Sequence, residues 1–297
     1  MKNTLYLLAL SAIAAVSLAA QDARPAKASD AKTRAVYVSV VDSKGIAVTG
    51  LTAADFTVRE DNVAREVLRA VPATEPLDIV VLVDDSQASQ PAISFLRDGL
   101  TQFVERLQGK ASIGIVTVGE RPTSVVERSS DIEAQKKGVT RIFARPGSGA
   151  YLLEAISDVS RGLQKRDVAR PVIVALSMEA IEYSNGSYER VLDDLYKSGA
   201  ALHVFSIGTL TVPLSDEIRN KNVVVAQGTE ATGGRREQLL AEMAIPDALG
   251  RLADELLKQY VVSYGRPEAL VPPEKLQVAV TKPGLTARAR TRLPNTK

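Results

Sequence analysis

The sequence predicts an α/β fold in which a mainly parallel sheet is covered by helices and joined to a small β unit. Short, continuous apolar runs occur in the middle of the chain, as expected for strands that are buried on both faces. Helical patterns separate these runs, which favours parallel pairing between the strands. Alternating, β-branched segments occur at both ends of the chain instead, and neither group has enough strands to bury an apolar face alone.

The N-terminal flank, residues 34–74, is predicted to be a set of strands joined by tight turns. Turn residues are found at Ser43–Gly45 and at Asp61–Asn62. The segments around them alternate between apolar and polar residues, which is typical of half-buried strands. The predicted strands are Ala35–Asp42, Phe56–Asp61 and Arg65–Val71.

The central region, residues 75–260, is predicted to alternate between buried strands and amphipathic helices. In one helix, apolar residues recur at spacings of 4, 3 and 4, which places them on one face. The predicted strands are Asp78–Asp84, Ser112–Val118, Pro171–Ser177, Ala201–Ile207 and a shorter one at Asn222–Ala226. The predicted helices are Ile93–Leu107, Tyr151–Leu163, Tyr188–Ser198 and Ile245–Tyr260.

The C-terminal flank, residues 261–293, reads as strands again. Turns that contain Pro and Gly separate the strand-like segments Gln259–Gly265, Lys275–Lys282 and Leu285–Leu293. Each flank would expose unpaired strand edges if it folded separately. We therefore expect the two flanks to pack together as one β unit.

The composition excludes several classes of function. The 297 residues include 37 basic and 35 acidic side chains, and no basic stripe that would indicate nucleic-acid binding. There is no Cys, which excludes disulfides, thiolate metal sites and a cysteine nucleophile. A single histidine, His203, makes most zinc sites impossible.

The first 20 residues have the layout of a secretory signal peptide. Lys2 precedes an apolar stretch, and the small residues Ser17, Ala19 and Ala20 follow it. A disordered lead-in is expected over residues 21–33, which are rich in Ala, Lys and Asp. No later segment is long and apolar enough to cross a bilayer, so the sequence predicts a periplasmic or secreted protein with no transmembrane segment after cleavage.

Several segments together carry a resemblance to a known family. They are VDSKGIAVTGLTAADFTVRED, LDIVVLVDDS, ATGGRRE and LADELLKQYVVSY with the later KLQVAVTKPGLTARAR. The middle of the chain resembles a von Willebrand factor type A (VWA) domain, and the mature chain is similar to the "VWFA-related" group of exported bacterial proteins. The resemblance implies a doubly wound, Rossmann-like sheet with a cation site at the carboxyl edge of its strands. This site is the metal-ion-dependent adhesion site (MIDAS).

The first element of that site has the pattern Asp-x-Ser-x-Ser and follows the first strand of the sheet. Asp84 and Ser86 match its first two positions, but Ala88 takes the third and Ser89 comes one residue late. A register that starts at Asp85 keeps Ser89 but puts Gln87 where the middle serine belongs. Either register keeps two of the three residues.

The other two elements have lost their oxygen ligands. Ala150 stands where the family has Thr, and Met178 stands where it has Asp, with Glu179 beside it as a substitute carboxylate. Mg²⁺ and Mn²⁺ require oxygen donors in near-octahedral arrangement, and neither Ala nor Met supplies one. The sequence therefore predicts no cofactor, and a vestigial metal site made of Asp84, Ser86, Ser89 and Glu179.

Loss of the ligands would make the same edge of the sheet less polar. An apolar surface there favours a protein partner, although the same residues would also serve simply to cover the core. The predicted partner-binding rim is Ala150, Tyr151, Met178, Ile181 and Tyr183.

No sequence motif indicates an enzyme more strongly than it indicates an ordinary structural role. The first strand is not followed by G-x-G-x-x-G, and Ser148 lacks the spacing of a nucleophile elbow. His203 lies inside an apolar run, as a histidine of a strand core would. We therefore favour a non-enzymatic, metal-independent interaction module of the cell envelope. The alternatives are a cation-dependent adhesion domain that uses Asp84, Ser86 and Glu179, and an exported hydrolase.

Overall fold

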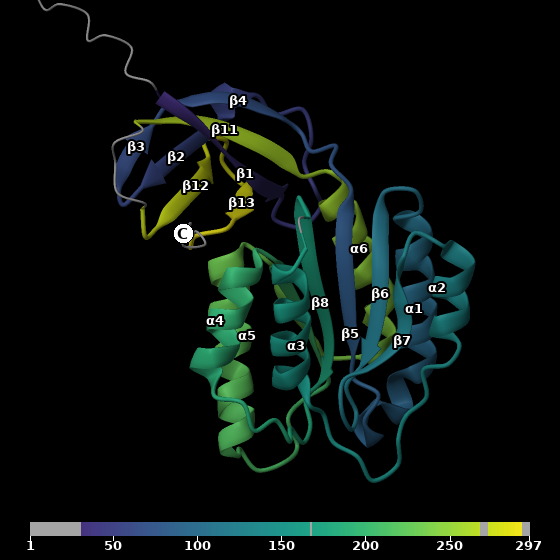
Figure 1. Ribbon diagram of the computed structural model, residues 1–297. Helices are drawn as coiled ribbons and strands as arrows, with labels where there is room; N and C mark the ends of the chain where they lie inside the picture. The colour runs from purple at the N-terminus through teal and green to yellow at the C-terminus, as the bar shows by residue number, and fades with distance from the viewer. Residues whose placement is uncertain (1–30, 167, 268–272, 293–297) are drawn as a thin grey trace, which may run out of the picture.

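The central feature of the fold is a six-stranded sheet in the order β10-β9-β8-β5-β6-β7 (Figure 1). The computed structural model describes residues 31–166, 168–267 and 273–292. The strands are β5 (Leu77–Val83), β6 (Ala111–Thr117), β7 (Thr123–Ser129), β8 (Arg170–Met178), β9 (Ala201–Ile207) and β10 (Arg236–Leu239). All neighbours pair in parallel except β7, which runs antiparallel along the edge.

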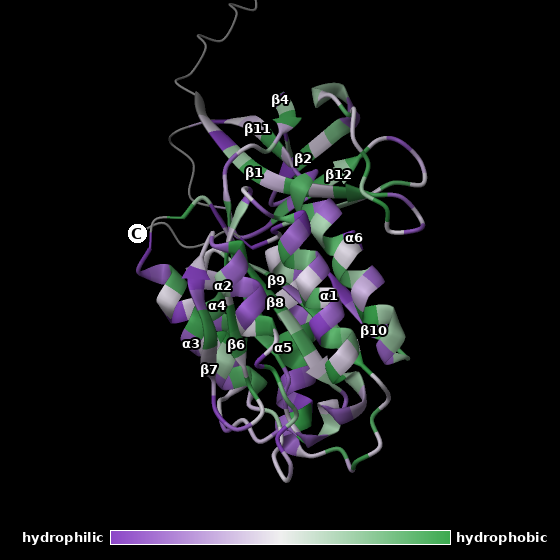
Figure 2. Ribbon diagram, turned by 90° about the vertical axis from the view of Figure 1, so that its right-hand side faces the viewer, coloured by the Kyte–Doolittle hydropathy of each residue, from purple (hydrophilic) through white to green (hydrophobic). Residues whose placement is uncertain are grey.

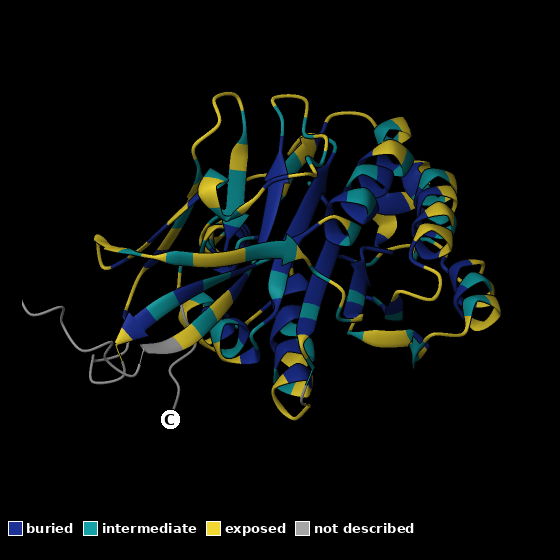
Figure 3. Ribbon diagram, turned by 90° about the horizontal axis from the view of Figure 1, so that it is seen from above, coloured by how far each residue is buried: buried dark blue, intermediate teal, exposed yellow. Residues whose placement is uncertain are grey.

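Helices cover both faces of this sheet, which confirms the predicted doubly wound α/β fold. One face carries α1 (Ile93–Arg106), α2 (Ile132–Val139) and α6 (Ile245–Leu257), and the other carries α3 (Leu152–Gln164), α4 (Tyr188–Ser198) and α5 (Asp216–Thr232). Two separate apolar cores result, one on each face. The parallel strands are buried and mainly hydrophobic, whereas the helices alternate between buried apolar and exposed polar residues (Figures 2 and 3).

The two ends of the chain pair with each other in a small antiparallel unit beside the central sheet. One of its sheets has the order β13-β1-β11-β4 and the other β12-β2-β3. The strands are β1 (Ala31–Val41), β2 (Phe56–Glu60), β3 (Val63–Arg65), β4 (Val67–Pro72), β11 (Tyr260–Pro267), β12 (Leu276–Val280) and β13 (Thr286–Ala289). Val38, Val262 and Tyr264 are fully buried or nearly so in its core, where the rings of Phe56 and Tyr260 meet at 5.5 Å.

The largest correction concerns Asn222–Ala226, which was predicted as a strand and lies within α5. Its β-branched valines favour a strand locally, but the ends of the segment carry helix signals. Ser215 accepts a hydrogen bond from the Ile218 N–H at the start, and Gly233 adopts the left-handed conformation (φ 74°) just past the end. The helix also buries an apolar stripe against the sheet, so tertiary packing outweighs the local β preference.

Several predicted boundaries also change. The last helix ends at Leu257, because Tyr260 already belongs to β11. The strand predicted at Arg65–Val71 divides at Glu66, where the chain passes from one sheet of the β unit to the other. The disordered lead-in predicted at residues 21–33 extends too far, because residues 31–33 already belong to β1 and pair with Gly265–Pro267. Its earlier part and the signal peptide at residues 1–20 lie outside the described residues. Three elements were not predicted from the sequence: β7, α2 and β10.

None of the helices in the described part of the chain combines the length and apolar character needed to cross a membrane.

Candidate functional site

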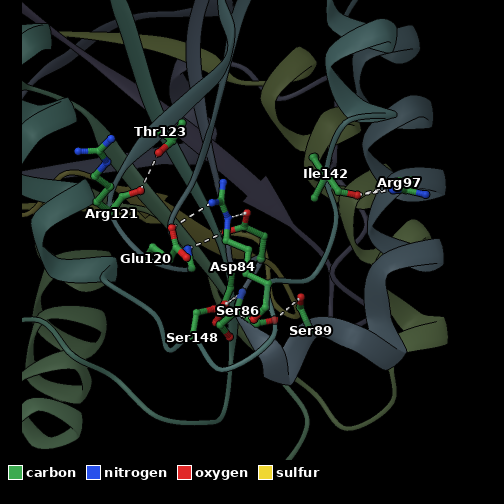
Figure 4. A network of polar contacts seen from close by, with 12 residues as sticks. Asp84, Ser86, Ser89, Arg97, Glu120, Arg121, Thr123, Ile142 and Ser148 are labelled. Atoms are coloured by element: carbon green, nitrogen blue, oxygen red, sulfur yellow. Dashed lines mark hydrogen bonds and ion pairs between the residues drawn. The ribbon is translucent and has the colours of Figure 1, made fainter.

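The predicted metal site lies at the carboxyl end of β5, where the strand order of the sheet reverses. From β5 the chain moves to β6 on one side, and it returns to β8 on the other. Such a switch point is where ligands bind in open α/β sheets. The turn after β5 continues into a short 3₁₀ segment, Gln87–Ala92, that leads into α1. Figure 4 shows Asp84, Ser86 and Ser89 around this turn.

Asp84 is buried, and backbone donors already hold both of its carboxylate oxygens. The Ser86 N–H donates to Oδ1 at 2.9 Å, and the Met178 N–H donates to Oδ2 at 2.9 Å. Burial raises the pKa of the Asp84 carboxyl, while hydrogen bonds from Ser86 and Met178 and the charge of Lys221 lower it. Asp84 therefore ties the end of β5 to the end of β8.

Asp85, the alternative starting residue of the motif, is engaged in the same way. Its Oδ1 accepts a hydrogen bond from the Gly119 N–H at 2.6 Å, and its Oδ2 forms an ion pair with Arg145 Nε at 2.7 Å. Arg145 also reaches Glu120 at 3.2 Å. Asp85 and Arg145 thus fasten the loop before α3 to the first loop of the sheet.

The serine hydroxyl at the third position of the motif is used within its own turn. Ser89 is fully buried, and its Oγ donates to the Ser86 carbonyl at 2.7 Å. It therefore stabilises the 3₁₀ segment instead of facing a ligand.

A buried lysine stands at the centre of the acidic groups. Lys221 comes from α5 and is only 2% exposed. Its Nζ lies 3.8 Å from Glu179 Oε2 and 3.5 Å from the Met178 carbonyl, to which it donates. It also interacts electrostatically with Asp84 and Glu182, and in both cases its charge lowers the pKa of the carboxyl. We call Asp84, Glu179, Glu182 and Lys221 the acid–lysine cluster.

Glu182 is a second buried carboxyl of this cluster whose pKa is raised. It is buried, and its Oε1 accepts hydrogen bonds from the Leu152 N–H at 3.0 Å and from Ser184, while no hydrogen bond reaches Oε2 within the described structure. Burial raises the pKa of Glu182 to about 7, against the lowering effects of Ser184, Lys221 and Leu152. Its position anchors the start of α3 to the loop after β8.

The structure brings the predicted rim residues together but places them at different depths. Backbone hydrogen bonds join Ala150 to Ile181 and Tyr183, and the rings of Tyr151 and Tyr183 lie 5.9 Å apart. Ile181 and Tyr183 are exposed, and Tyr151 is half-buried. Ala150 and Met178 are buried beneath them. The prediction that these two contact a partner is therefore wrong, because they offer no surface to one.

A wider apolar surface was missed by the sequence analysis. The loops that follow β8, β9 and β10 each expose large apolar side chains at the same edge of the sheet. Leu240 and Met243, after β10, are exposed by 74% and 72%. We call this surface the apolar edge. It consists of Ile181, Tyr183, Leu210, Leu214, Leu240 and Met243.

The two side chains considered for hydrolysis, His203 and Ser148, are each engaged in other hydrogen bonds. His203 is completely buried in β9, and its Nδ1 accepts a hydrogen bond from the Arg235 N–H at 3.1 Å. Burial lowers the pKa of His203 to about 4. Ser148 donates its hydroxyl proton to the Arg145 carbonyl at 2.9 Å, in the loop before α3.

Comparison with known proteins identifies the fold. No family model matches the chain, and no curated protein matches it. A von Willebrand factor type A structure from Catenulispora acidiphila gives a TM-score of 0.52 at 11% identity, covering 87% of this chain and 74% of that one. Proximal thread matrix protein 1 from the mussel byssus, solved with a zinc-occupied MIDAS motif, gives 0.50 at 14% identity, covering 67% and 49%. Both similarities are to VWA structures, so this chain has a VWA-like fold.

Proposed function

Because the chain has a von Willebrand factor type A-like fold, we propose that it is a protein-binding module that works without a divalent cation. The proposal includes export to the cell envelope, from the signal-peptide layout of residues 1–20. It also includes the absence of catalysis, since the Ser148 hydroxyl donates to the Arg145 carbonyl and His203 is buried in β9.

The observation that carries the proposal is the ammonium group of Lys221. In a metal-dependent site, a cation neutralises the acids at the switch point and fixes the loops around it. Here a buried lysine brings a positive charge to Asp84, Glu179 and Glu182 from within the chain. A divalent ion that entered the same cluster would meet this charge in a region of low dielectric.

The donor set supports the same conclusion. Both oxygens of Asp84 and both oxygens of Asp85 already accept hydrogen bonds or ion pairs, and the Ser89 hydroxyl bonds within its turn. Hard cations require several free oxygen ligands. Among the described residues, no group of three or more His, Cys, Asp or Glu side chains could hold a metal.

The apolar edge is the proposed contact surface. Exposed apolar side chains gathered from three successive loops are typical of protein-binding sites. The acid–lysine cluster lies directly beneath part of this surface and would hold the loop after β8 in one conformation. A preorganised surface loses less conformational entropy on binding.

The test is partner capture from an extract of the organism's own cell envelope with the mature, tagged protein. The wild type is compared with a double variant that carries Leu240→Asp and Met243→Asp, and with a control variant. Leu68→Asp is the matched control, because Leu68 is also an exposed apolar residue but lies on β4 in the β unit. We expect the same partner in EDTA and in Mg²⁺, retained by the control and lost by the double variant.

Two results would overturn the proposal. One is a partner that binds only when Mg²⁺ or Mn²⁺ is present, which would favour the cation-dependent adhesion domain. The other is a partner retained equally by the double variant, which would place the contact elsewhere on the molecule.

A further inference from the structure

A cavity of about 250 Å³ lies at the opposite edge of the central sheet, where the β unit packs on it. It is bounded by β1, by the first residues of β8 and β9, by the end of α5 and by β13. Part of its wall is apolar and includes Val36, Pro171 and Ala289. Three arginines, Arg170, Arg288 and Arg290, also line it, and they give the cavity an excess of positive charge.

Arg170 is buried and held by neutral oxygens. Its Nη1 donates to the Glu75 carbonyl at 2.8 Å, and its Nη2 donates to the Leu256 carbonyl at 2.6 Å and to Gln259 Oε1 at 2.8 Å. Its guanidinium also lies over the Tyr37 ring, 5.4 Å from the centroid. These contacts fix the position of the group while leaving its charge without a directly paired carboxylate among the described residues.

Arg288 lies in β13 and Arg290 directly follows its last residue, and both line the cavity. Arg288 is paired, because its Nη2 lies 2.5 Å from Glu255 Oε2. Arg290 forms no such ion pair in the described structure, and its buried Nη2 donates no hydrogen bond to any described side chain or carbonyl. Arg290 is half-buried, but a guanidinium whose Nη2 is buried without a counter-ion is costly. A bound anion would supply the missing counter-ion.

We propose that this cavity binds a small organic oxyanion, a carboxylate or a phosphate ester, whose charged group pairs with Arg290 and whose body packs on the apolar wall. Guanidinium groups favour such ligands because their N–H donors match two oxygens of one anion. Burial alone lowers the pKa of Arg290 to about 10, and a bound anion would offset that effect. The volume suits a ligand of modest size, below the range of typical drug-like pockets.

Calorimetric titration of the mature protein tests the proposal with two probes, inorganic phosphate and benzoate, each against sodium chloride at equal ionic strength. We expect saturable binding of at least one probe with one site per chain. Arg290→Gln should weaken that binding by roughly tenfold or more, because it removes a charge-assisted pair. Arg292→Gln is the matched control and should leave the affinity unchanged, because Arg292 is exposed and lies over the Tyr196 ring.

A second variant keeps the test decisive if Arg290→Gln folds poorly. Ala35 lines the cavity from an exposed position on β1, so Ala35→Leu should fill the cavity without disturbing the core. It should abolish binding while the melting temperature stays near that of the wild type. The proposal is overturned if neither probe binds more than chloride does. It is also overturned if Arg290→Gln and Arg292→Gln weaken binding equally, or if Ala35→Leu binds like the wild type.

Discussion

Replacing Lys221 with methionine removes the internal cation while keeping most of the side-chain volume. The variant leaves Glu179, Asp84 and Glu182 without their common positive charge. Removing one partner of a buried ion pair typically costs about 3–5 kcal/mol. Two of these carboxyls have raised pKa values and can take up a proton, so we expect the lower end, about 3 kcal/mol at neutral pH. The melting temperature should then fall by roughly 6–12 °C for a domain of this size.

The assay is thermal unfolding followed by circular dichroism at pH 7 and again at pH 5. The deficit should be smaller at pH 5, because protonation of the carboxyls removes the uncompensated charge. Lys197→Met is the control. Lys197 is also paired with an acid on a helix, at 2.5 Å from Asp193, but the pair is exposed and its loss should change little. If Lys221→Met melts with the wild type at pH 7, the ammonium does not hold the cluster and our reasoning fails.

The Lys221→Met variant also tests whether a working metal site can be restored. Ala88→Ser, Ala150→Thr and Met178→Asp together restore the family's ligand types, but Lys221 would still bring its charge to the cluster. We therefore expect the triple variant to gain no metal-dependent stability until Lys221→Met is added. A site with a dissociation constant near 100 µM would then add about 1.4 kcal/mol in 1 mM Mg²⁺. A full metal-induced shift in the triple variant with Lys221 intact would contradict this account.

Three further outcomes follow from the buried titratable groups and the strand pairing. The raised pKa of Glu182, about 7 against an ordinary 4.5, favours its protonated form in the folded state. Its contribution to stability is therefore complete below pH 4.5 and is lost as the pH rises through 7, a change of about 3 kcal/mol. In denaturant titrations, Glu182→Gln should become more stable relative to the wild type as the pH rises across that window. The pKa of His203 is lowered to about 4 from 6.5, so the pH dependence has the opposite sign. The contribution of His203 to stability is complete above pH 6.5 and is lost as the pH falls through 4. We therefore expect His203→Gln to resist acid unfolding better than the wild type. Deleting residues 268–297 removes β12, one of the two strands that pair with β2, so amide exchange should accelerate in Phe56–Glu60 but not in β5. Unchanged protection of Phe56–Glu60 would refute the pairing with β12.

The parallel sheet was predictable because burial on both faces leaves a strong signal in the chain. β5, β6, β8 and β9 are continuous apolar runs, and each was located within a few residues. The edge strands β7 and β10 are half exposed and carry charged residues, so their composition does not distinguish them from loops. The sequence also placed Asp84, Ser86 and Ser89 directly after β5, and they lie in the turn that follows this strand.

The acid–lysine cluster could not be predicted, because its members meet only in the folded chain. The importance of Lys221 was missed because the adjacent Asn222–Ala226 was predicted as a strand, whereas both lie in α5. The helix signals were present, since Ser215 precedes two acidic residues and Gly233 follows the last turn. In that helix, Lys221 falls on the buried stripe between Ile218 and Val225, where a lysine indicates an internal acidic partner. Glu182 gave no signal at all, because its burial depends on how the loop after β8 folds back toward α3.

The antiparallel unit that joins the two ends of the chain also constrains when folding can finish. The Leu51 N–H donates a hydrogen bond to the Tyr260 hydroxyl across 209 residues. Among the described strands, β1 pairs with β11 and β13. At a synthesis rate of about 5–20 residues per second, the first strand waits roughly 10–40 seconds for its partners. The parallel sheet needs much shorter loops and can form earlier. A chain that crosses a membrane before that interval ends would therefore arrive with its N-terminal strands still free, and close its last sheet only on the far side.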